Sequence, residues 1–400
     1  MASCTWELPY SSLDIGGSSF AKKPRYHDEP DASTESPSPK GSVMISNKYK
    51  NKYNNFINKN KIDYFIGKMY EGKNMKAVRV HKYGGGPKDL VYEEDVMQPP
   101  HPKEGEVLVK VYATGVTLNE IVWIWEHPGI SLPLILGHEF SGLVEEVGPK
   151  VTDQRKGDAV YGLTDPLSVT RNGAEAEYVI AMESEIASKP QSIDHEYAAG
   201  VPMVGLTAWQ ALFDHAHLSS KDTILIHGAA GGVGSFAVQL ARWSGAHVIG
   251  TASAYDSSFL EDLGVHDVID YKKTRFEDRV HDVDVIFDTV GGKTLERSWR
   301  ILRSGGRLVS VASQGISTSY DKRQEYLKEK GDSFGVNATW FIVHSSREQL
   351  IRIGELIDSG QLRPVVDTIL SLSEASKAYE GAKDIHKHGK IVLRVRTELE

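Results

Sequence analysis

Thr223-Ile-Leu-Ile-His-Gly-Ala-Ala-Gly-Gly-Val-Gly234, followed at once by Ser235-Phe-Ala-Val-Gln-Leu-Ala-Arg242, is the stretch that decides the fold. Its opening apolar run is typical of a strand covered on both faces, and the apolar positions after Gly234 recur at helical spacing. The glycines between them let the backbone approach a phosphate closely and direct the free N–H groups of a helix N-terminus at it. The stretch therefore predicts a strand, a glycine-rich turn and a helix that together bind a phosphate.

The turn also matches the pattern of glycines that binds dinucleotides, except that alanine replaces the first glycine. The six positions are Ala229, Ala230, Gly231, Gly232, Val233 and Gly234. A second strand is predicted at 246–251, and further strands at 267–271, 283–290, 306–312 and 333–343, with helical stretches between most of them. Six strands are the number expected of a complete doubly wound dinucleotide-binding domain.

Composition limits the class of protein. A chain of 400 residues with 40% hydrophobic residues predicts two domains with a sizeable core. No apolar run approaches the roughly 20 residues that cross a bilayer, and we therefore expect no membrane span. The net charge of -8 argues against a nucleic-acid partner.

The cysteine count limits the covalent and metal chemistry. The single cysteine is Cys4, which excludes disulfides within the chain and a cysteine-based zinc site in the globular part. This agrees with a reducing compartment, and we expect a cytoplasmic protein.

Residues 1–74 differ in composition from the rest. The segment 28–39 is rich in serine, proline and acidic residues, the segment 47–61 is rich in asparagine and lysine, and neither can build a core. The two interpretations are a disordered or low-complexity extension and a targeting or docking segment. The acids Asp28, Glu29 and Asp31 argue against a transit peptide, since such peptides are poor in acids.

From Met75 the pattern becomes that of a β-rich lobe. Residues 75–80 and 106–112 alternate between apolar and polar, and shorter strands are predicted at 141–147, 159–162 and 176–180. Helices are predicted at 196–211, 347–359 and 372–382, and 390–395 is predicted as a closing strand that returns to the first lobe. We therefore predict a first domain at 75–200, completed by 344–400, and a nucleotide-binding domain at 201–343.

The end of the second strand indicates which dinucleotide binds. A carboxylate there binds the ribose 2′-OH of NAD and repels the 2′-phosphate of NADP. The strand ends without an acid until Asp256, which we expect to be the N-cap of the following helix. We therefore expect NADPH. Lys272 and Lys273 either contact its 2′-phosphate or form a solvated surface pair. The groups that could reach the 2′-phosphate are Thr251, Ser253, Tyr271, Lys272 and Lys273.

Several ordered motifs carry a family resemblance. They are Gly137-His-Glu-Phe-Ser-Gly-Leu-Val-Glu-Glu-Val-Gly148, Lys156-Gly-Asp-Ala-Val-Tyr-Gly162, Gly205-Leu-Thr-Ala-Trp209, the turn 228–234, Val268-Ile-Asp-Tyr271 and Phe287-Asp-Thr-Val-Gly-Gly292. With them, the chain from Met75 to Val395 resembles the zinc-independent quinone oxidoreductase (zeta-crystallin-like) branch of the medium-chain dehydrogenase/reductase superfamily.

The resemblance implies a GroES-like catalytic domain around an inserted Rossmann domain. It further implies hydride transfer from NADPH to a quinone or to the β-carbon of an α,β-unsaturated carbonyl. By the same resemblance the turn 231–234 binds the pyrophosphate and Ser253 and Tyr271 contact the adenosine phosphate end. Thr207 then lies near the nicotinamide, Val311 and the backbone from Phe341 to Val343 line its pocket, and a homodimer forms by edge pairing near 335–340.

The chain departs from the zinc-dependent relatives. Those proteins have a cysteine ligand in the segment aligned with 113–120 and use the histidine of the Gly-His-Glu motif. Here Thr117 takes the position of the cysteine, and His138 alone cannot hold a catalytic zinc. We therefore expect a metal-free reaction in which His138 and Glu139 are structural.

Without a metal, hydrogen-bond donors must stabilise the oxygen that gains charge as hydride arrives. The candidates are Thr117, Asn119 and Tyr161, with Asn119 preferred because its amide donates without changing its protonation state. A turn or capping role is the alternative for Asn119, and water could protonate the product. Trp123, Trp125 and His127 could form an aromatic wall for a flat substrate or simply pack the lobe.

Two other functions remain open. One is an enoyl reductase acting in trans on thioester-bound intermediates of a biosynthetic pathway, which the same lobes and cofactor would serve. The other is a non-catalytic, crystallin-like protein that binds NADPH.

Overall fold

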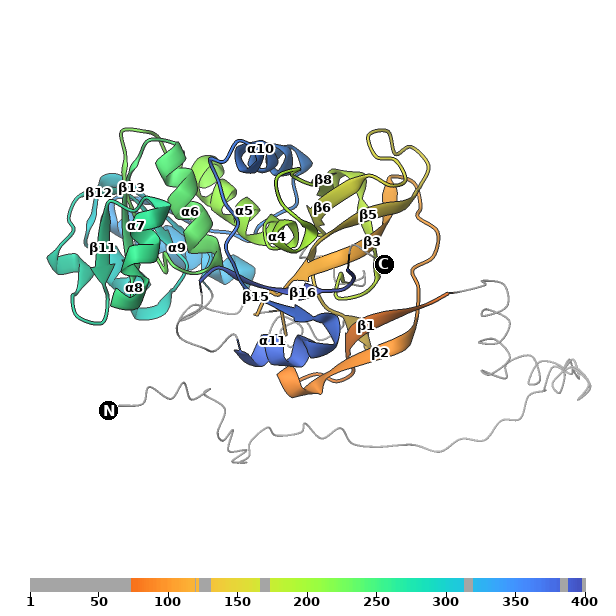
Figure 1. The fold of residues 1–400 in the computed structure, drawn as a ribbon. Coiled ribbons are helices and arrows are strands. Elements are labelled where there is room, and N and C mark those ends of the chain that lie inside the picture. Colours follow the sequence, from red (N-terminus) through yellow and green to blue (C-terminus); the bar gives the residue numbers. More distant parts are fainter. Residues whose placement is uncertain are drawn as a thin grey trace, which may run out of the picture. The chain divides into compact units, whose positions relative to one another are not determined.

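A computed structural model describes residues 73–118, 120–121, 131–165, 173–312, 319–381 and 388–397 (Figure 1).

The glycine-rich turn follows a strand of a parallel six-stranded sheet. Its strands lie in the order β11-β10-β9-β12-β13-β14. They are β9 (Thr223–His227), β10 (His247–Ala252), β11 (Asp267–Asp270), β12 (Val283–Asp288), β13 (Leu302–Ser310) and β14 (Asn337–Trp340). This is the doubly wound order, and it confirms the predicted Rossmann fold with six strands. The strand order reverses at β9, the point where such sheets bind dinucleotides.

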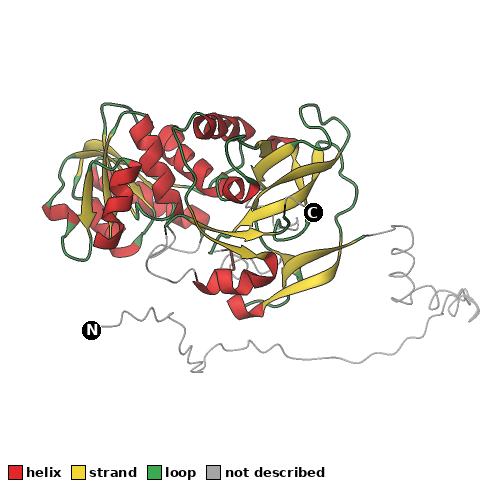
Figure 2. Ribbon diagram, in the orientation of Figure 1, coloured by secondary structure: helices red, strands yellow, loops and turns green. Residues whose placement is uncertain are grey.

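Helices surround this sheet, whereas strands dominate the other lobe (Figure 2). The helices are α4 (His195–Ala199), α5 (Pro202–Trp209), α6 (Gly232–Trp243), α7 (Ser257–Leu263), α8 (Gly292–Ser298), α9 (Tyr320–Phe334), α10 (Arg347–Asp358) and α11 (Ala375–Gly381). A π-helical segment, η3 (Gln210–His215), continues α5. Short 3-10 helices are η1 (Pro87–Asp89), η2 (Glu183–Glu185), η4 (Ala254–Asp256), η5 (Phe276–Asp278) and η6 (Leu372–Glu374).

Two predicted boundaries were wrong. The single helix predicted at 196–211 is divided after Ala199, because Pro202 lacks an N–H group and starts a new helix, α5. The strand predicted at 333–343 is shorter, because α9 continues to Phe334 and ends at Gly335, whose φ of +66° favours glycine.

The β-rich lobe contains a three-stranded sheet in the order β2-β1-β4 and a seven-stranded sheet in the order β15-β16-β3-β5-β6-β8, with β7 paired to β3. The strands are β1 (Asn74–Val80), β2 (Leu90–Met97), β3 (Glu106–Gly115), β4 (Leu134–Ile135), β5 (Glu139–Val147), β6 (Ala159–Leu163), β7 (Tyr178–Met182), β8 (Ile186–Ser188), β15 (Val366–Ser371) and β16 (Lys390–Arg394). Strand β16 pairs antiparallel with β3, which confirms that the chain returns to its first lobe.

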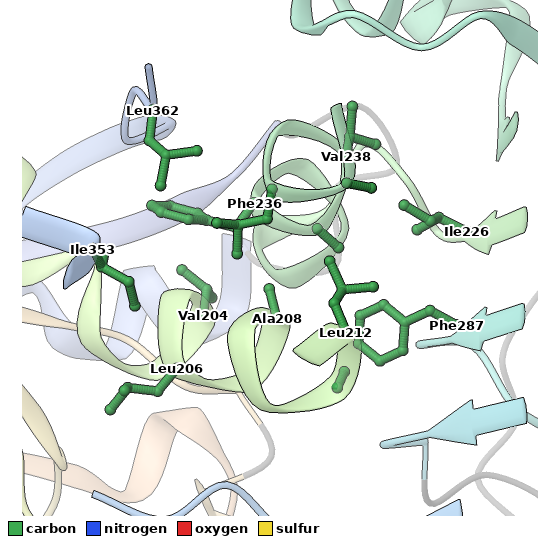
Figure 3. Packing of buried hydrophobic residues seen from close by; sticks show 14 of the residues in the cluster. Val204, Leu206, Ala208, Leu212, Ile226, Phe236, Val238, Phe287, Ile353 and Leu362 are labelled. Atoms are coloured by element: carbon green, nitrogen blue, oxygen red, sulfur yellow. The ribbon is translucent and has the colours of Figure 1, made fainter. Parts of the chain in front are cut away.

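Packing fixes the helix that follows the glycine turn. Phe236 and Val238 of α6 are buried in one hydrophobic cluster with Val204 and Ala208 of α5 (Figure 3). Full burial of a side chain such as Phe236 contributes about 1.5–3 kcal/mol. The same cluster includes Tyr161 of β6. Helix α5 therefore joins the Rossmann core to the β-rich lobe.

None of the helices in the described part of the chain is long and apolar enough to cross a membrane.

Candidate cofactor site and active site

The glycine turn leaves the N-terminus of α6 open. Gly228 follows β9 with a φ of +70°, and a Cβ there would lie 2.5 Å from the Thr289 hydroxyl oxygen. The N-cap of α6 is Gly231, which forms no side-chain capping bond. Because no side chain forms a capping hydrogen bond at this end, N–H groups of the first turn are available to an anion. The order of strand, turn and helix is as predicted, and the site fits a pyrophosphate.

The turn also explains the alanine at the first position of the dinucleotide pattern. That position makes the tight turn, for which glycine is normally needed. Here Gly228, one residue earlier, takes the left-handed conformation, and Ala229 is buried with its N–H donating to the Thr251 carbonyl at 3.2 Å. At the other end of the turn, a Cβ on Gly234 would collide with the Gly228 carbonyl oxygen. Glycine at 234 therefore permits the close packing of helix on strand.

Three side chains near the 2′ position have partners within the protein. The Ser253 hydroxyl is buried and donates to Asp256 Oδ2 at 2.6 Å, and its hydrogen is therefore not available to a phosphate. Asp256 does precede α7 as its N-cap, but its carboxylate accepts from Ser253 instead of capping the helix. Thr251 is also buried, with its hydroxyl oxygen 3.1 Å from His227 Nδ1.

The Asp256 carboxylate is held inside the protein by two partners. Its Oδ1 lies 2.8 Å from His388 Nε2, whose ring stacks on Phe259 at 4.1 Å between centroids. Burial raises the pKa of Asp256, but the hydrogen bonds from Ser253 and His388 outweigh burial and lower it. The carboxylate is therefore ionised but engaged within the protein.

Tyr271 lies in the loop after β11 with 55% of its surface exposed. The Lys272 ammonium lies 5.9 Å from the centre of the Tyr271 ring. Lys273 is paired with Asp270 at 3.8 Å. Tyr271, Lys272 and Lys273 are therefore the accessible members of the set predicted for the 2′-phosphate, and Lys273 is the one that is already in an ion pair.

The residues predicted around the nicotinamide lie after neighbouring parallel strands. Val311 directly follows β13 and donates its N–H to the Asp288 carbonyl at 3.1 Å, and Phe341 follows β14 and donates to the Ser310 carbonyl at 3.4 Å. Phe341 and Val343 are buried. Since the carboxyl ends of parallel strands meet at one edge of a sheet, these residues lie at the same edge as the glycine turn.

Thr207 lies on α5 and is buried. Its hydroxyl donates to the Met203 carbonyl one turn earlier, at 2.6 Å. It therefore has no hydroxyl hydrogen left for the cofactor, and contact with the nicotinamide would be through its methyl group or oxygen.

Of the three catalytic candidates, the structure argues against Tyr161. Its side chain is fully buried, its hydroxyl donates to the Leu350 carbonyl at 2.5 Å, and burial raises its pKa far above the ordinary value. This phenol therefore holds α10 against β6. Asn119 lies outside the described residues, as do Trp123, Trp125 and His127.

Thr117, the third candidate, is half-buried. Its Oγ1 lies 3.4 Å from Lys390 Nζ, at the first residue of β16. This lysine also forms a 2.5 Å ion pair with Glu139 and donates to the Val116 carbonyl at 2.7 Å.

Lys390 was not among the site residues predicted from the sequence. The signal for it was a glutamate at the start of a buried strand, since such a carboxylate requires a cation.

A second buried polar cluster surrounds His138. Glu120 accepts from the Gly137 N–H at 2.8 Å and lies 2.5 Å from His138 Nδ1. Burial lowers the pKa of His138, but the charge and hydrogen bond of Glu120, together with the charges of Glu139 and Asp165, outweigh burial and raise it. Tyr379 donates to Glu175 at 2.7 Å, and burial, with the charge of Glu120 added, raises the pKa of Glu175 to about 8.

The donor atoms at this place do not fit a zinc ion. By the resemblance described above, Thr117 takes the position of the cysteine ligand of the zinc-dependent relatives, and a zinc ion beside His138 would therefore lack its thiolate. Across the described ranges, no three histidine, cysteine or acidic side chains are grouped as metal ligands would be. The one cysteine of the chain, Cys4, lies outside those ranges.

Comparison with known proteins agrees with this architecture. Residues 103–191 match the family described as alcohol dehydrogenase GroES-like domain, and residues 263–393 match the family described as zinc-binding dehydrogenase. The quinone oxidoreductase of Mus musculus is 31% identical over 341 residues, which cover 80% of this chain and 98% of that protein. NAD(P)H oxidoreductase RTN4IP1, mitochondrial, of Mus musculus is 31% identical over 359 residues, which cover 80% of this chain and 89% of that protein.

Among solved structures, the Escherichia coli quinone oxidoreductase complexed with NADPH superimposes with a TM-score of 0.70 at 28% identity. The match covers 80% of this chain and 100% of that one. The chain belongs to the medium-chain dehydrogenase/reductase superfamily, in the branch that contains the quinone oxidoreductases.

Proposed function

We propose that this chain transfers hydride from NADPH, without a metal ion, to a quinone or to the C=C bond of an α,β-unsaturated carbonyl. The observation that carries the proposal is the open N-terminus of α6 at Gly231, at the switch point of the Rossmann sheet. The quinone oxidoreductases of rat and mouse, at 30% and 31% identity, support the class of reaction.

The preference for NADPH follows from the groups beyond β10. An NAD-binding site needs a free carboxylate for the ribose 2′-OH. The nearest carboxylate, Asp256, is already bound to Ser253 and His388. Tyr271 is exposed and Lys272 adds a positive charge beside it, and both suit a 2′-phosphate. The NADPH in the Escherichia coli quinone oxidoreductase structure supports the same choice.

The bound cofactor would supply the hydride, and the residues of the chain would orient the acceptor. Thr117 can donate a hydrogen bond to the acceptor oxygen as negative charge develops there, and a donor of this kind contributes about 3 kcal/mol to the transition state. Asn119 remains a second predicted donor. The acceptor carbon or oxygen would take its proton from water, and most of the rate would come from positioning.

The test is NADPH oxidation against a quinone, a short 2-alkenal, a cyclic enone and an enoyl thioester, each with and without a chelator. Turnover of the quinone or an enone that resists the chelator is expected. Turnover of the thioester alone would identify the enoyl reductase. Tight NADPH binding with no turnover would identify a non-catalytic NADPH-binding protein. Turnover abolished by the chelator would refute the metal-free mechanism.

The proposal includes the organisation of the protein. Residues 75–200 with 344–400 would form the catalytic domain, and 201–343 the cofactor domain. Strand β14 is at the edge of the six-stranded sheet and would pair with a second copy to form a homodimer. Light scattering of the purified chain tests the dimer. The cytoplasm remains the proposed location, although one set of relatives is named mitochondrial, and cell fractionation tests it.

A further inference from the structure

Lys390 is a buried cation at the junction between the two lobes. Only 7% of its surface is exposed, and its partner Glu139 is fully buried. The ammonium group forms an ion pair with Glu139 Oε1 at 2.5 Å and donates hydrogen bonds to the Val116 carbonyl at 2.7 Å and to Thr117 Oγ1 at 3.4 Å. A buried ion pair stabilises a fold little compared with apolar packing, and stability alone is therefore a weak reason for a lysine at this position.

The pair touches the Rossmann part at two places. Glu139 Oε2 accepts from the N–H of Met203 in the first turn of α5, at 3.0 Å. A Cβ on Gly232, the first residue of α6, would lie 3.2 Å from Lys390 Cδ. The residue before the lysine, Gly389, donates its N–H to the Ala230 carbonyl at 3.3 Å. Lys390 therefore lies between the glycine turn and the segment that carries Thr117.

We propose that Lys390 is a positioning residue for the reaction, acting through Thr117. A threonine hydroxyl has one hydrogen and two lone pairs. When Oγ1 accepts from the ammonium, its own hydrogen is directed away from Lys390 and stays available to the acceptor oxygen of a bound substrate. The ammonium also makes the hydroxyl a stronger donor, because hydrogen bonds in a chain polarise one another. This role rests on the proposed function, in which Thr117 is the hydrogen-bond donor that the Lys390 ammonium orients.

The test is a double-mutant cycle on kcat. Lys390→Met alone would leave Glu139 as an unpaired buried charge, and we therefore combine K390M with E139Q. Both this pair and T117V are expected to lower kcat for a quinone at least tenfold, with the Kd for NADPH changed less than threefold. The kcat of the triple variant K390M/E139Q/T117V is expected to be no lower than that of the slower of its two parents, K390M/E139Q and T117V. The reason is that both parents lose the same interaction, the one between Lys390 and Thr117.

Controls separate this effect from loss of structure. The exposed pair of Lys156 and Glu145, 2.7 Å apart in the same lobe, is replaced by K156M with E145Q, and kcat should change less than twofold. If K390M/E139Q does not fold, Lys390→Arg keeps the charge but displaces the donor, and the same cycle is run with it. Urea unfolding without cofactor should also show non-additivity between T117V and the change at 390.

The outcomes are distinct. Fold-changes in kcat that multiply in the triple variant, or a K390M/E139Q variant with wild-type kcat, would overturn the role of Lys390 while leaving the proposed function intact. A wild-type chain that reduces none of the acceptors would overturn both.

Discussion

Replacement of Gly231 by aspartate should make the protein more stable and unable to bind its cofactor. Gly231 has φ −74° and ψ 176°, which any residue adopts. A Cβ there meets only the Gly228 carbonyl oxygen, at 3.4 Å. The variant therefore folds. Aspartate at an N-cap accepts from the first-turn N–H groups and interacts favourably with the helix dipole, and we expect a gain of about 0.5–1 kcal/mol in the free energy of unfolding.

The same carboxylate should exclude the pyrophosphate. It would occupy the N–H groups that receive the phosphate and add a negative charge beside it. Two unit charges about 4 Å apart repel by about 4 kcal/mol at an effective dielectric constant of about 20. This corresponds to an increase of about a thousandfold in Kd.

The two effects are measured separately on one variant. Titration calorimetry with NADPH gives the Kd, and urea unfolding without cofactor gives the stability. Gly231→Ala is the matched control, since it adds the same Cβ without charge and should weaken binding less than tenfold. A folded Gly231→Asp variant that binds NADPH within tenfold of the wild type would show that the pyrophosphate does not bind at this turn.

Three further changes have defined outcomes. Aspartate at position 253, the usual means of favouring NADH, would face the buried Asp256 carboxylate and should lower the free energy of unfolding by about 3 kcal/mol, as urea unfolding can check. Tyr161→Phe removes the hydrogen bond from the phenol to the Leu350 carbonyl and should cost about 1–2 kcal/mol of stability, with kcat within twofold of wild type. A large fall in kcat would restore Tyr161 as a catalytic candidate. Burial raises the pKa of Glu175 to about 8, above its ordinary value of 4.5. The protonated carboxyl of Glu175 therefore contributes stability that is complete below pH 4.5 and is lost as the pH rises through 8. Thermal unfolding should therefore show the wild type losing a few kcal/mol relative to Glu175→Gln between pH 6 and 9, and parallel pH profiles would contradict this.

The Rossmann strands could be predicted because each is an apolar run buried on both faces. Residues 223–227 and 283–288 show this plainly. In the β-rich lobe the signal is weaker where a strand is little buried. In β2, only Val96 is buried, and in β15 none of the six residues is. Pairing with neighbouring strands defines these elements, and a local pattern does not contain that information.

The candidate site was predictable where backbone geometry makes it, and less so where side chains do. The glycines of the turn permit a left-handed backbone and a close approach of helix to strand, and a glycine-rich stretch indicates both directly from the sequence. Ser253 and Tyr161 were assigned roles by residue type alone. In the structure the Ser253 hydroxyl is bound to Asp256 within its own turn, and the Tyr161 hydroxyl is bound to Leu350, which is distant in the sequence. Lys390 contacts Val116 across 274 residues of sequence. The local pattern at Glu139 shows that a cation is needed, but it does not show which residue supplies it.

The position of β16 has a consequence for the order in which the molecule can be assembled during synthesis. In the seven-stranded sheet β16 lies between β15 and β3, and its first residue is part of the polar junction beside the glycine turn. The six strands from β9 to β14 are complete when residue 340 has been made, and they can pair while the chain is still attached to the ribosome. The place beside β3 stays empty until residues 390–394 emerge, and Glu139 has no cation until then. On the growing chain, the proposed nucleotide site can therefore form before the junction that we propose for the reaction.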